Sequence, residues 1–207
     1  MYKKILWEII MSKSFKIISV VLIVLFVVVI PSCGTYNNMV DKQEAVESQW
    51  AQVENQYQRR MDLIPNLVST VKGYAAHESE TFQAITDARS KVGSIQVTKE
   101  ILDDPEALKK YQEAQSQLSG ALSRLLAVSE NYPELKANEN FLSLQDQLEG
   151  TENRISVERN RFNESVKDYN VTIRRFPQNI FAKMFGFREK AYFTASEGAS
   201  VAPTVKF

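Results

Sequence analysis

The side chains that could take part in covalent chemistry are few, and the most informative one is the single cysteine. Cys33 follows Ile30, Pro31 and Ser32 at the end of an apolar run. An aliphatic residue three positions before a cysteine and a small residue directly before it are typical of a bacterial lipobox, although Pro31 departs from that pattern. The motif predicts a thioether lipid on Cys33, with cleavage before it. The alternative is an uncleaved signal anchor in which Cys33 lies at the outer edge.

The apolar run that precedes Cys33 extends from Ile17 to Ile30 and contains 14 residues. This length is short for a helix that spans a bilayer, which needs about 20 residues, but it fits the apolar core of a secretory signal. Lys13 and Lys16 precede the run and are expected to stay in the cytoplasm. Translation from Met1 or from Met11 would preserve these features. We therefore predict a protein of the cell membrane or outer membrane, with its body on the periplasmic, extracytoplasmic side.

Catalytic and metal-binding side chains are otherwise scarce. The chain has one histidine, His77. A metal centre, a Ser–His dyad or a Cys–His dyad would each have to use that single residue. We expect no catalytic residues, no metal and no cofactor, and hence no enzymatic activity. Lys and Arg together number 25, as do Asp and Glu, so the net charge of zero gives no reason to expect a nucleic-acid partner.

Five charged residues lie on or beside the apolar faces of the expected helices. They permit two interpretations. In one, they are edge positions whose charged ends reach water. In the other, they form a buried network that sets which helices pair and in what register. The five are Arg60, Glu78, Arg89, Glu152 and Arg159.

The elements that position these residues are long amphipathic helices. Apolar residues recur every three or four positions in four segments, and little strand signal is present. Pro65 interrupts the pattern, so the helix either kinks there or the chain reverses between Asp62 and Asn66. Helices with one apolar face must bury it against each other, which predicts an all-α, up-and-down bundle of four segments behind the N-terminal membrane-targeting segment. The stripes are Tyr36, Met39, Val46, Trp50, Val53, Tyr57 and Ile64; Leu67, Val71, Tyr74, Phe82, Ile85 and Val92; Leu108, Tyr111, Leu118, Leu122, Leu125 and Val128; and Phe141, Leu144, Leu148, Ile155, Phe162, Val166, Tyr169, Ile173 and Phe176.

Local signals predict where these helices begin and end. Residues 94–103 are expected to form a loop, and Asp104 followed by Pro105 is a typical helix start. Asn138 is expected to cap the last long helix, which Pro177 closes. Gly150 lies inside that helix at a cost of about 1 kcal/mol relative to alanine, for which a close helix–helix approach would be a reason.

The C-terminal part combines aromatic and basic residues. Phe181, Phe185 and Phe187 are its candidate contact residues. A short helix and an extended segment could fold back onto the bundle, or the aromatic residues could form a surface for the membrane interface or a partner protein. We divide the chain into a targeting segment (1–33), a bundle domain (34–187) and a partly disordered tail (188–207).

Several blocks of sequence match a known family. They are Tyr36–Val40, Gln58–Val68, Val71–Glu78, Asn131–Phe141, Leu144–Ile155 and Phe176–Ile180. This series, which covers nearly all of residues 36–187, resembles the LemA family. The resemblance implies a membrane-attached helical bundle that faces away from the cytoplasm, without an established enzymatic activity. Genes of the family neighbour those of membrane proteases and TPM-domain proteins, so the resemblance makes such a protein a candidate for the envelope partner.

Our leading hypothesis is a lipid-anchored adaptor or scaffold that binds another envelope protein. One alternative is a structural envelope component that self-associates, including as a homo-oligomer, through helix faces. An enzyme with carboxylate-only chemistry is a third, which would need paired carboxylates converging in a pocket.

Overall fold

The computed structural model describes the backbone of residues 2–194 and the side chains of residues 17–20 and 34–194. Within these residues every regular element is helical, which confirms the all-α prediction. The elements are α1 (Tyr2–Lys72), α2 (Ser79–Ser94), the 3₁₀ helix η1 (Lys99–Asp103), α3 (Pro105–Ser129), α4 (Pro133–Lys136), α5 (Glu139–Arg174) and α6 (Gln178–Phe185).

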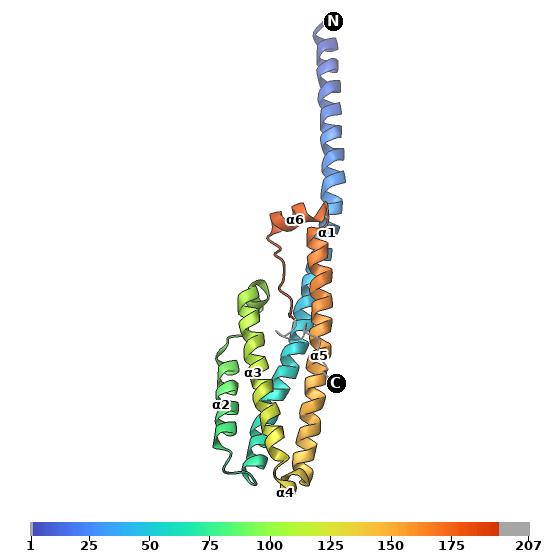
Figure 1. Ribbon diagram of the computed structural model, residues 1–207. Coiled ribbons are helices and arrows are strands. Elements are labelled where there is room, and N and C mark those ends of the chain that lie inside the picture. Colours follow the sequence, from blue (N-terminus) through green and yellow to red (C-terminus); the bar gives the residue numbers. More distant parts are fainter. Residues whose placement is uncertain (1, 195–207) are drawn as a thin grey trace, which may run out of the picture.

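The four long helices run alternately up and down (Figure 1). α1 packs most extensively on α5, and α2 packs on α3. The α2–α3 pair is shorter and covers the lower part of the α1–α5 pair, while α4 closes the lower end. The N-terminal part of α1 projects beyond the body at the opposite end. The α1–α5 pair is thus the spine of the molecule.

The core consists largely of the apolar stripes that the sequence predicts. Met39, Val46, Val53 and Ile64 are almost fully buried on α1, and equivalent positions of α3 and α5 face them. Fully burying a side chain of this kind stabilises the fold by roughly 1.5–3 kcal/mol. Six stripe positions instead lie half-buried or exposed, namely Tyr36, Tyr74, Phe82, Val128, Leu144 and Phe176.

Pro65 neither ends the first helix nor marks the reversal. α1 continues through it to Lys72, and the chain turns between Gly73 and Glu78. Of the two alternatives left open at Pro65, the reversal between Asp62 and Asn66 does not occur, because one helix continues through this segment. Ile64 and Leu67 on either side of Pro65 are buried in the core, so tertiary packing stabilises the helix past a residue that costs roughly 3 kcal/mol.

The helix caps agree with the sequence, whereas two other local predictions do not. The carboxylate of Asp104 accepts hydrogen bonds from the first turn of α3, and Asn138 caps α5 through the N–H of Phe141 at 3.0 Å. The expected loop at 94–103 instead contains η1, because Leu102 is an apolar anchor with no exposed surface. A Cβ added to Gly150 would meet nothing within 4 Å, so no close helix approach explains this glycine.

The upper half of the α1–α5 spine is covered by the C-terminal part of the chain. α6 lies across the bundle beside the point where α1 leaves it, and an extended segment from Arg188 to Thr194 runs down from α6 along the body (Figure 1). The N–H of Ala191 donates to the carbonyl of Leu102 at 2.8 Å, which joins this segment to η1. Residues 188–194 therefore pack onto the bundle.

The N-terminal targeting segment falls mostly on side chains that the structure leaves out. Among the side chains that are described, no helix contains a stretch with the length and hydropathy needed to cross a membrane. The side chain of Cys33 lies outside the described set, and so does the tail from residue 195 onward.

Candidate functional site

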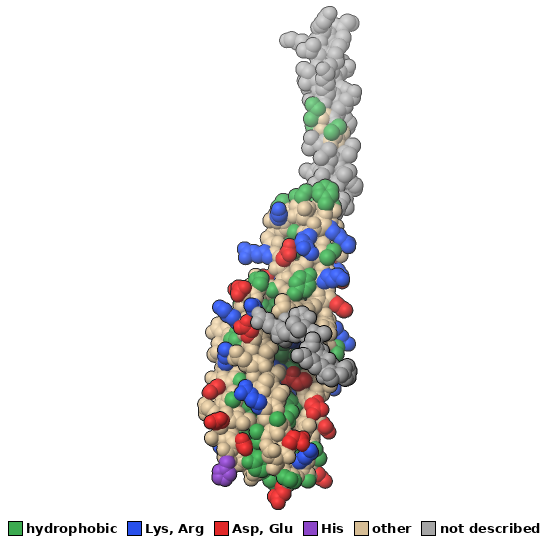
Figure 2. All heavy atoms as spheres, viewed as in Figure 1, with side chains coloured by type: hydrophobic (Ala, Val, Ile, Leu, Met, Phe, Trp, Pro, Cys, Tyr) green, Lys and Arg blue, Asp and Glu red, His purple; other side chains and the backbone are tan. Residues whose placement is uncertain are grey.

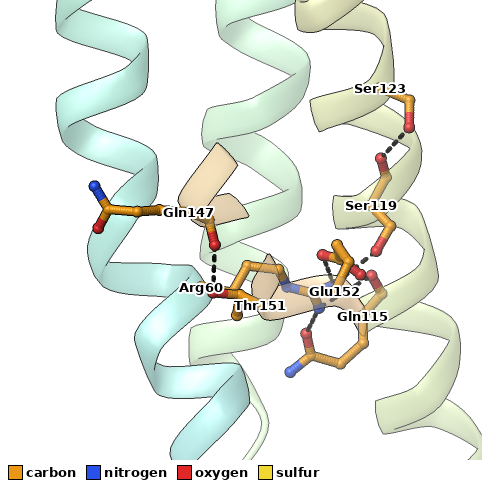
Figure 3. A network of polar contacts seen from close by, with 7 residues as sticks. All are labelled: Arg60, Gln115, Ser119, Ser123, Gln147, Thr151 and Glu152. Atoms are coloured by element: carbon orange, nitrogen blue, oxygen red, sulfur yellow. Dashed lines mark hydrogen bonds and ion pairs between the residues drawn. The ribbon is translucent and has the colours of Figure 1, made fainter. Parts of the chain in front are cut away.

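A buried arginine lies at the centre of the body. Arg60 is 1% exposed, and its Nη1 donates to Glu152 Oε1 and to Ser119 Oγ, each at 2.7 Å. Its Nη2 donates to the side-chain oxygen of Gln115, and its guanidinium lies over the ring of Tyr57, 5.3 Å from the ring centre. Figure 3 shows Arg60 with Gln115, Ser119 and Glu152, which come from three helices, α1, α3 and α5. Arg60 thus connects both helix pairs.

Hydrogen-bond donors outnumber acceptors around Arg60. Arg60 Nε and Gln115 Nε2 are buried, and neither has a hydrogen-bond partner among the described residues. Unpaired buried donors are costly, at about 1–3 kcal/mol each. The site is therefore suited to a group that accepts hydrogen bonds, such as a carbonyl or a carboxylate.

Arg60 and Gln115 are among the residues that line an open groove of about 300 Å³ between the helices. Its lining is mixed in polarity and includes a second arginine, Arg159. One carboxylate oxygen of Glu152 is bonded to Arg60, and the guanidinium groups of Arg60 and Arg159 are the positively charged donors of this lining. The lining residues are Tyr57, Arg60, Gln112, Gln115, Ser116, Ser119, Glu152, Ile155 and Arg159.

Directly above this groove, two asparagines of α5 hold the extended segment by its backbone. Asn170 donates to the carbonyl of Lys190 and accepts from its N–H, both at 2.9 Å. Asn163 makes the same pair of bonds with Phe193, at 3.0 and 2.9 Å. Asn163 and Asn170 are seven residues apart and so share one helical face. Two amide side chains thus bind main-chain groups, largely without regard to sequence.

Aromatic packing anchors the end of that segment. The ring of Phe193 stacks on Trp50 at 5.8 Å between ring centres and meets Phe162 edge-on at 5.4 Å. The guanidinium of Arg159 covers the same ring at 4.5 Å and donates to the carbonyl of Thr194 at 3.3 Å. Gln112 also bonds to Thr194, so two lining residues of the open groove hold the last described residue. The segment and the groove thus form one continuous track.

The structure brings together only part of the predicted charge network. Arg60 and Glu152 are paired, and Arg159 lies in the same groove. Glu78 lies in the turn before α2, where it accepts from the hydroxyl of Tyr132 at 3.1 Å. Arg89 is on α2 and borders a separate depression next to Pro65. Three of the five predicted network residues, Arg60, Glu152 and Arg159, are therefore neighbours in the structure.

The single histidine lies away from the groove. His77 is in the turn between α1 and α2, at the lower end of the body, where its exposed side chain is visible in Figure 2. No group of three His, Cys, Asp or Glu side chains with metal-binding geometry occurs among the described residues.

The candidate contact residues near the C-terminus differ in exposure. Phe185 is 48% exposed, whereas Phe181 and Phe187 are half-buried against the core. Phe185 and Phe187 both pack edge-on against Tyr36, at 5.0 and 5.7 Å between ring centres. The more exposed side chains of this region are therefore others, namely Phe176, Ile180 and Met184.

Burial affects the tyrosines beside the groove. It raises the pKa of the Tyr57 hydroxyl, although the nearby charges of Arg159 and Arg60 oppose the shift. It also raises the pKa of Tyr111, to about 12. Both hydroxyls therefore stay protonated at physiological pH.

Sequence reasoning missed the polar residues that complete the site. Gln115 falls between Tyr111 and Leu118 in the apolar stripe of α3, a position where an amide has to find a buried partner. Asn163 and Asn170 repeat at a seven-residue spacing on α5. Amides on or beside the apolar faces were the available signal, but only the fold shows that Gln115 meets Arg60 and that the two asparagines face an extended segment.

Comparisons with known proteins place this chain among relatives of one family. The profile of the LemA family matches residues 49–207. The chain is 30% identical over 174 residues to magnetosome protein MamQ of Magnetospirillum gryphiswaldense, covering 76% of this chain and 64% of that protein. It therefore spans less than two thirds of the length of that relative. It is 29% identical to magnetosome protein MamQ 2 of Paramagnetospirillum magneticum (86% of this chain, 70% of the relative). It is 27% identical to protein LemA of Metamycoplasma hominis (79% and 71%).

The family profile covers α2 to α6, the groove around Arg60 and the segment held by Asn163 and Asn170. The resemblance seen in the sequence motifs is thus confirmed over most of the bundle, and the chain belongs to the LemA family.

Proposed function

We propose that this protein is a membrane-anchored, extracytoplasmic LemA-family bundle that acts as an adaptor for an envelope partner protein and has no catalytic activity. The observation that carries the adaptor role is the groove beside Arg60. It combines buried donors that lack partners with an open mouth and a neighbouring surface already shaped to hold extended backbone.

The expected ligand follows from this chemistry. An extended segment of the partner would offer main-chain carbonyls, and an acidic side chain would offer a carboxylate. Both are acceptors for hydrogen bonds from the guanidinium and amide side chains of Arg159, Arg60 and Gln115 in the groove lining. Hydrogen bonds to charged groups contribute roughly 1.5–3 kcal/mol each, so one well-placed carboxylate accounts for much of a moderate affinity.

The proposed tether rests on the N-terminal sequence and on the course of α1. The lipobox-like end at Cys33 comes directly before the part of α1 that joins the bundle. Several acyl chains at Cys33 would make a firm anchor, since each buried methylene contributes about 0.8 kcal/mol. An outward-facing body on the cell membrane or the outer membrane fits this arrangement.

The tether is tested by intact mass of the protein from its native membrane, with Cys33→Ala beside the wild type. We expect a mature species that begins at Cys33 and carries diacylglycerol and acyl mass, and that is absent from the variant. An unmodified chain that retains the residues before Cys33 would replace the lipid anchor with a signal anchor.

The adaptor role is tested by photocrosslinking in cells. Benzoylphenylalanine replaces Ser116, an exposed residue of the groove lining, or Glu113, an exposed residue of α3 that is not part of that lining. We expect a crosslinked band from position 116 but not from 113, and we expect Arg159→Glu to remove it. The partner in that band, identified by mass spectrometry, should be a membrane protease, a TPM-domain protein or another envelope protein.

The same experiment separates the alternatives. A band at twice the mass of the chain, containing only this protein, would favour the self-associating structural component. A band that persists unchanged in Arg159→Glu, or equal bands from positions 116 and 113, would show that the groove is not the partner site.

A further inference from the structure

The outer face of α6 exposes apolar side chains next to the point where α1 leaves the bundle. Phe176, just before α6, is 80% exposed, and Ile180 and Met184 are 57% and 64% exposed. Ile180 and Met184 are four residues apart and therefore lie on one face of the helix. The opposite face packs on the bundle through Ala182, which is 3% exposed. α6 is thus an amphipathic helix whose apolar outer face has no partner among the described residues.

Basic residues surround this surface. Arg174, Arg175, Lys183 and Arg188 are all exposed, and no acidic residue occurs between positions 174 and 188. Glu189 follows directly and lies 4.0 Å from Arg174, so the positive charges of this surface exceed the negative ones by three. In Figure 2, Lys and Arg side chains gather around the upper end of the body, whereas Asp and Glu side chains are prominent at the lower end. The apolar face therefore lies within a positively charged rim.

Its position also matters. α6 runs crosswise to α1 at the base of the projecting N-terminal part (Figure 1), and Tyr36 of α1 packs against Phe185 of α6 at 5.0 Å. Only two residues separate Tyr36 from Cys33 in the sequence. A membrane surface that lies perpendicular to α1 at the level of Cys33 would therefore run along the length of α6.

We propose that α6 is an interfacial helix that lies flat on the surface of an anionic phospholipid bilayer, with Ile180, Met184 and Phe176 among the acyl chains and the basic rim at the headgroups. Apolar residues on one side of a short crosswise helix, with Lys and Arg at its edges, are typical of helices that bind in the plane of a membrane. Basic residues near an anionic surface each add to that attraction. The proposal rests on the membrane tether proposed above, and it fixes how the body stands on the membrane.

The test uses the full chain in phosphatidylglycerol-containing vesicles with or without bromine on the lipid acyl chains, since bromine quenches nearby tryptophan fluorescence. Met184→Trp places the probe on α6. Val157→Trp is the matched control, because Val157 is also an exposed apolar residue, 47% exposed, but lies on the middle of α5. Flotation of the vesicles and a thermal melt of each variant show that the chain is tethered and folded.

We expect the emission added by Met184→Trp to be quenched strongly in brominated vesicles and shifted to the blue, while that of Val157→Trp is unchanged. We also expect Lys183→Glu combined with Arg188→Glu to reduce the quenching of Met184→Trp. Protein that floats with the vesicles but shows equal emission from both probes would overturn the interfacial role of α6 and leave the tether intact. Protein that does not float would instead refute the tether.

Discussion

Removing Glu152 should destabilise the bundle more than removing Arg60, although Arg60 is the more deeply buried of the two. Glu152 is the carboxylate partner of Arg60, at 2.7 Å, and its side chain is 38% exposed, whereas that of Arg60 is 2% exposed. In Glu152→Ala the guanidinium keeps its charge in the interior and retains only neutral partners. In Arg60→Met the remaining carboxylate can turn to water, and a flexible apolar side chain fills the space.

The structure sets the size of each effect. Removing one partner of a fully buried ion pair costs about 3–5 kcal/mol. Because water can reach the Glu152 side of this pair, we expect about 2–3 kcal/mol for Glu152→Ala. Arg60→Met loses hydrogen bonds to Ser119 and Gln115, worth about 1 kcal/mol each, but it also removes the cost of a buried charge. We therefore expect a loss of no more than about 1 kcal/mol.

Urea unfolding of the full chain in detergent, followed by circular dichroism, measures both losses. In thermal melts a loss of 2–3 kcal/mol corresponds to a decrease in Tm of about 4–12 °C for a chain of this size. The exposed pair Lys136–Glu130 is the control, and Lys136→Met should cost under about 1 kcal/mol. A larger loss in Arg60→Met than in Glu152→Ala, or no loss in either, would refute the reasoning about desolvation.

Four further predictions concern the rest of the bundle. Lys99 donates to Glu47 and thereby lowers the pKa of that carboxyl below its ordinary 4.5, against the opposing effect of burial; the stability difference between wild type and Lys99→Met should be full at neutral pH and disappear as pH falls below the ordinary value, because the pair stabilises the fold only while Glu47 is ionised. Asp104→Ala should cost about 1 kcal/mol in urea unfolding, since it removes the cap of α3. Gly150→Ala should raise stability by about 1 kcal/mol, because a Cβ there meets nothing within 4 Å, and a lower melting temperature would contradict this. Trp50→Ala, which removes a side chain that packs on Tyr111, Phe162 and Phe193, should cost about 3–5 kcal/mol.

The bundle itself was readable from the sequence because its signals are local and periodic. The stripe from Met39 to Ile64 repeats every three or four residues, and the caps at Asp104 and Asn138 follow from side-chain chemistry within one turn. Pro65 left two alternatives open because its local penalty is opposed by long-range packing of Ile64 and Leu67, which no single helical segment reveals. Gly150 misled the prediction, since a glycine on an open helix face needs no partner.

The site was less predictable because it depends on contacts far apart in the chain. The pairing of Arg60 with Glu152 joins residues 92 positions apart, and the hold of Gln112 on Thr194 spans 82. The sequence marked Arg60, Glu152 and Arg159 as charges near apolar faces, but Glu78 and Arg89 carry the same pattern and lie elsewhere. Periodicity assigns a residue to a face of its helix, whereas only the arrangement of the helices determines which charge it meets.

The continuity of α1 has a mechanical consequence. α1 comprises 71 residues without a break, and the stretch from Tyr36 to Lys72 alone measures about 55 Å at 1.5 Å per residue. Because α5 packs along this stretch, the two helices form a stiff lever rather than a head on a flexible linker. A tilt at Tyr36 therefore moves the α4 end through an arc with a radius of about 55 Å. The distance of the groove beside Arg60 from the N-terminal end of this stretch is fixed by the number of helical turns between Tyr36 and Arg60.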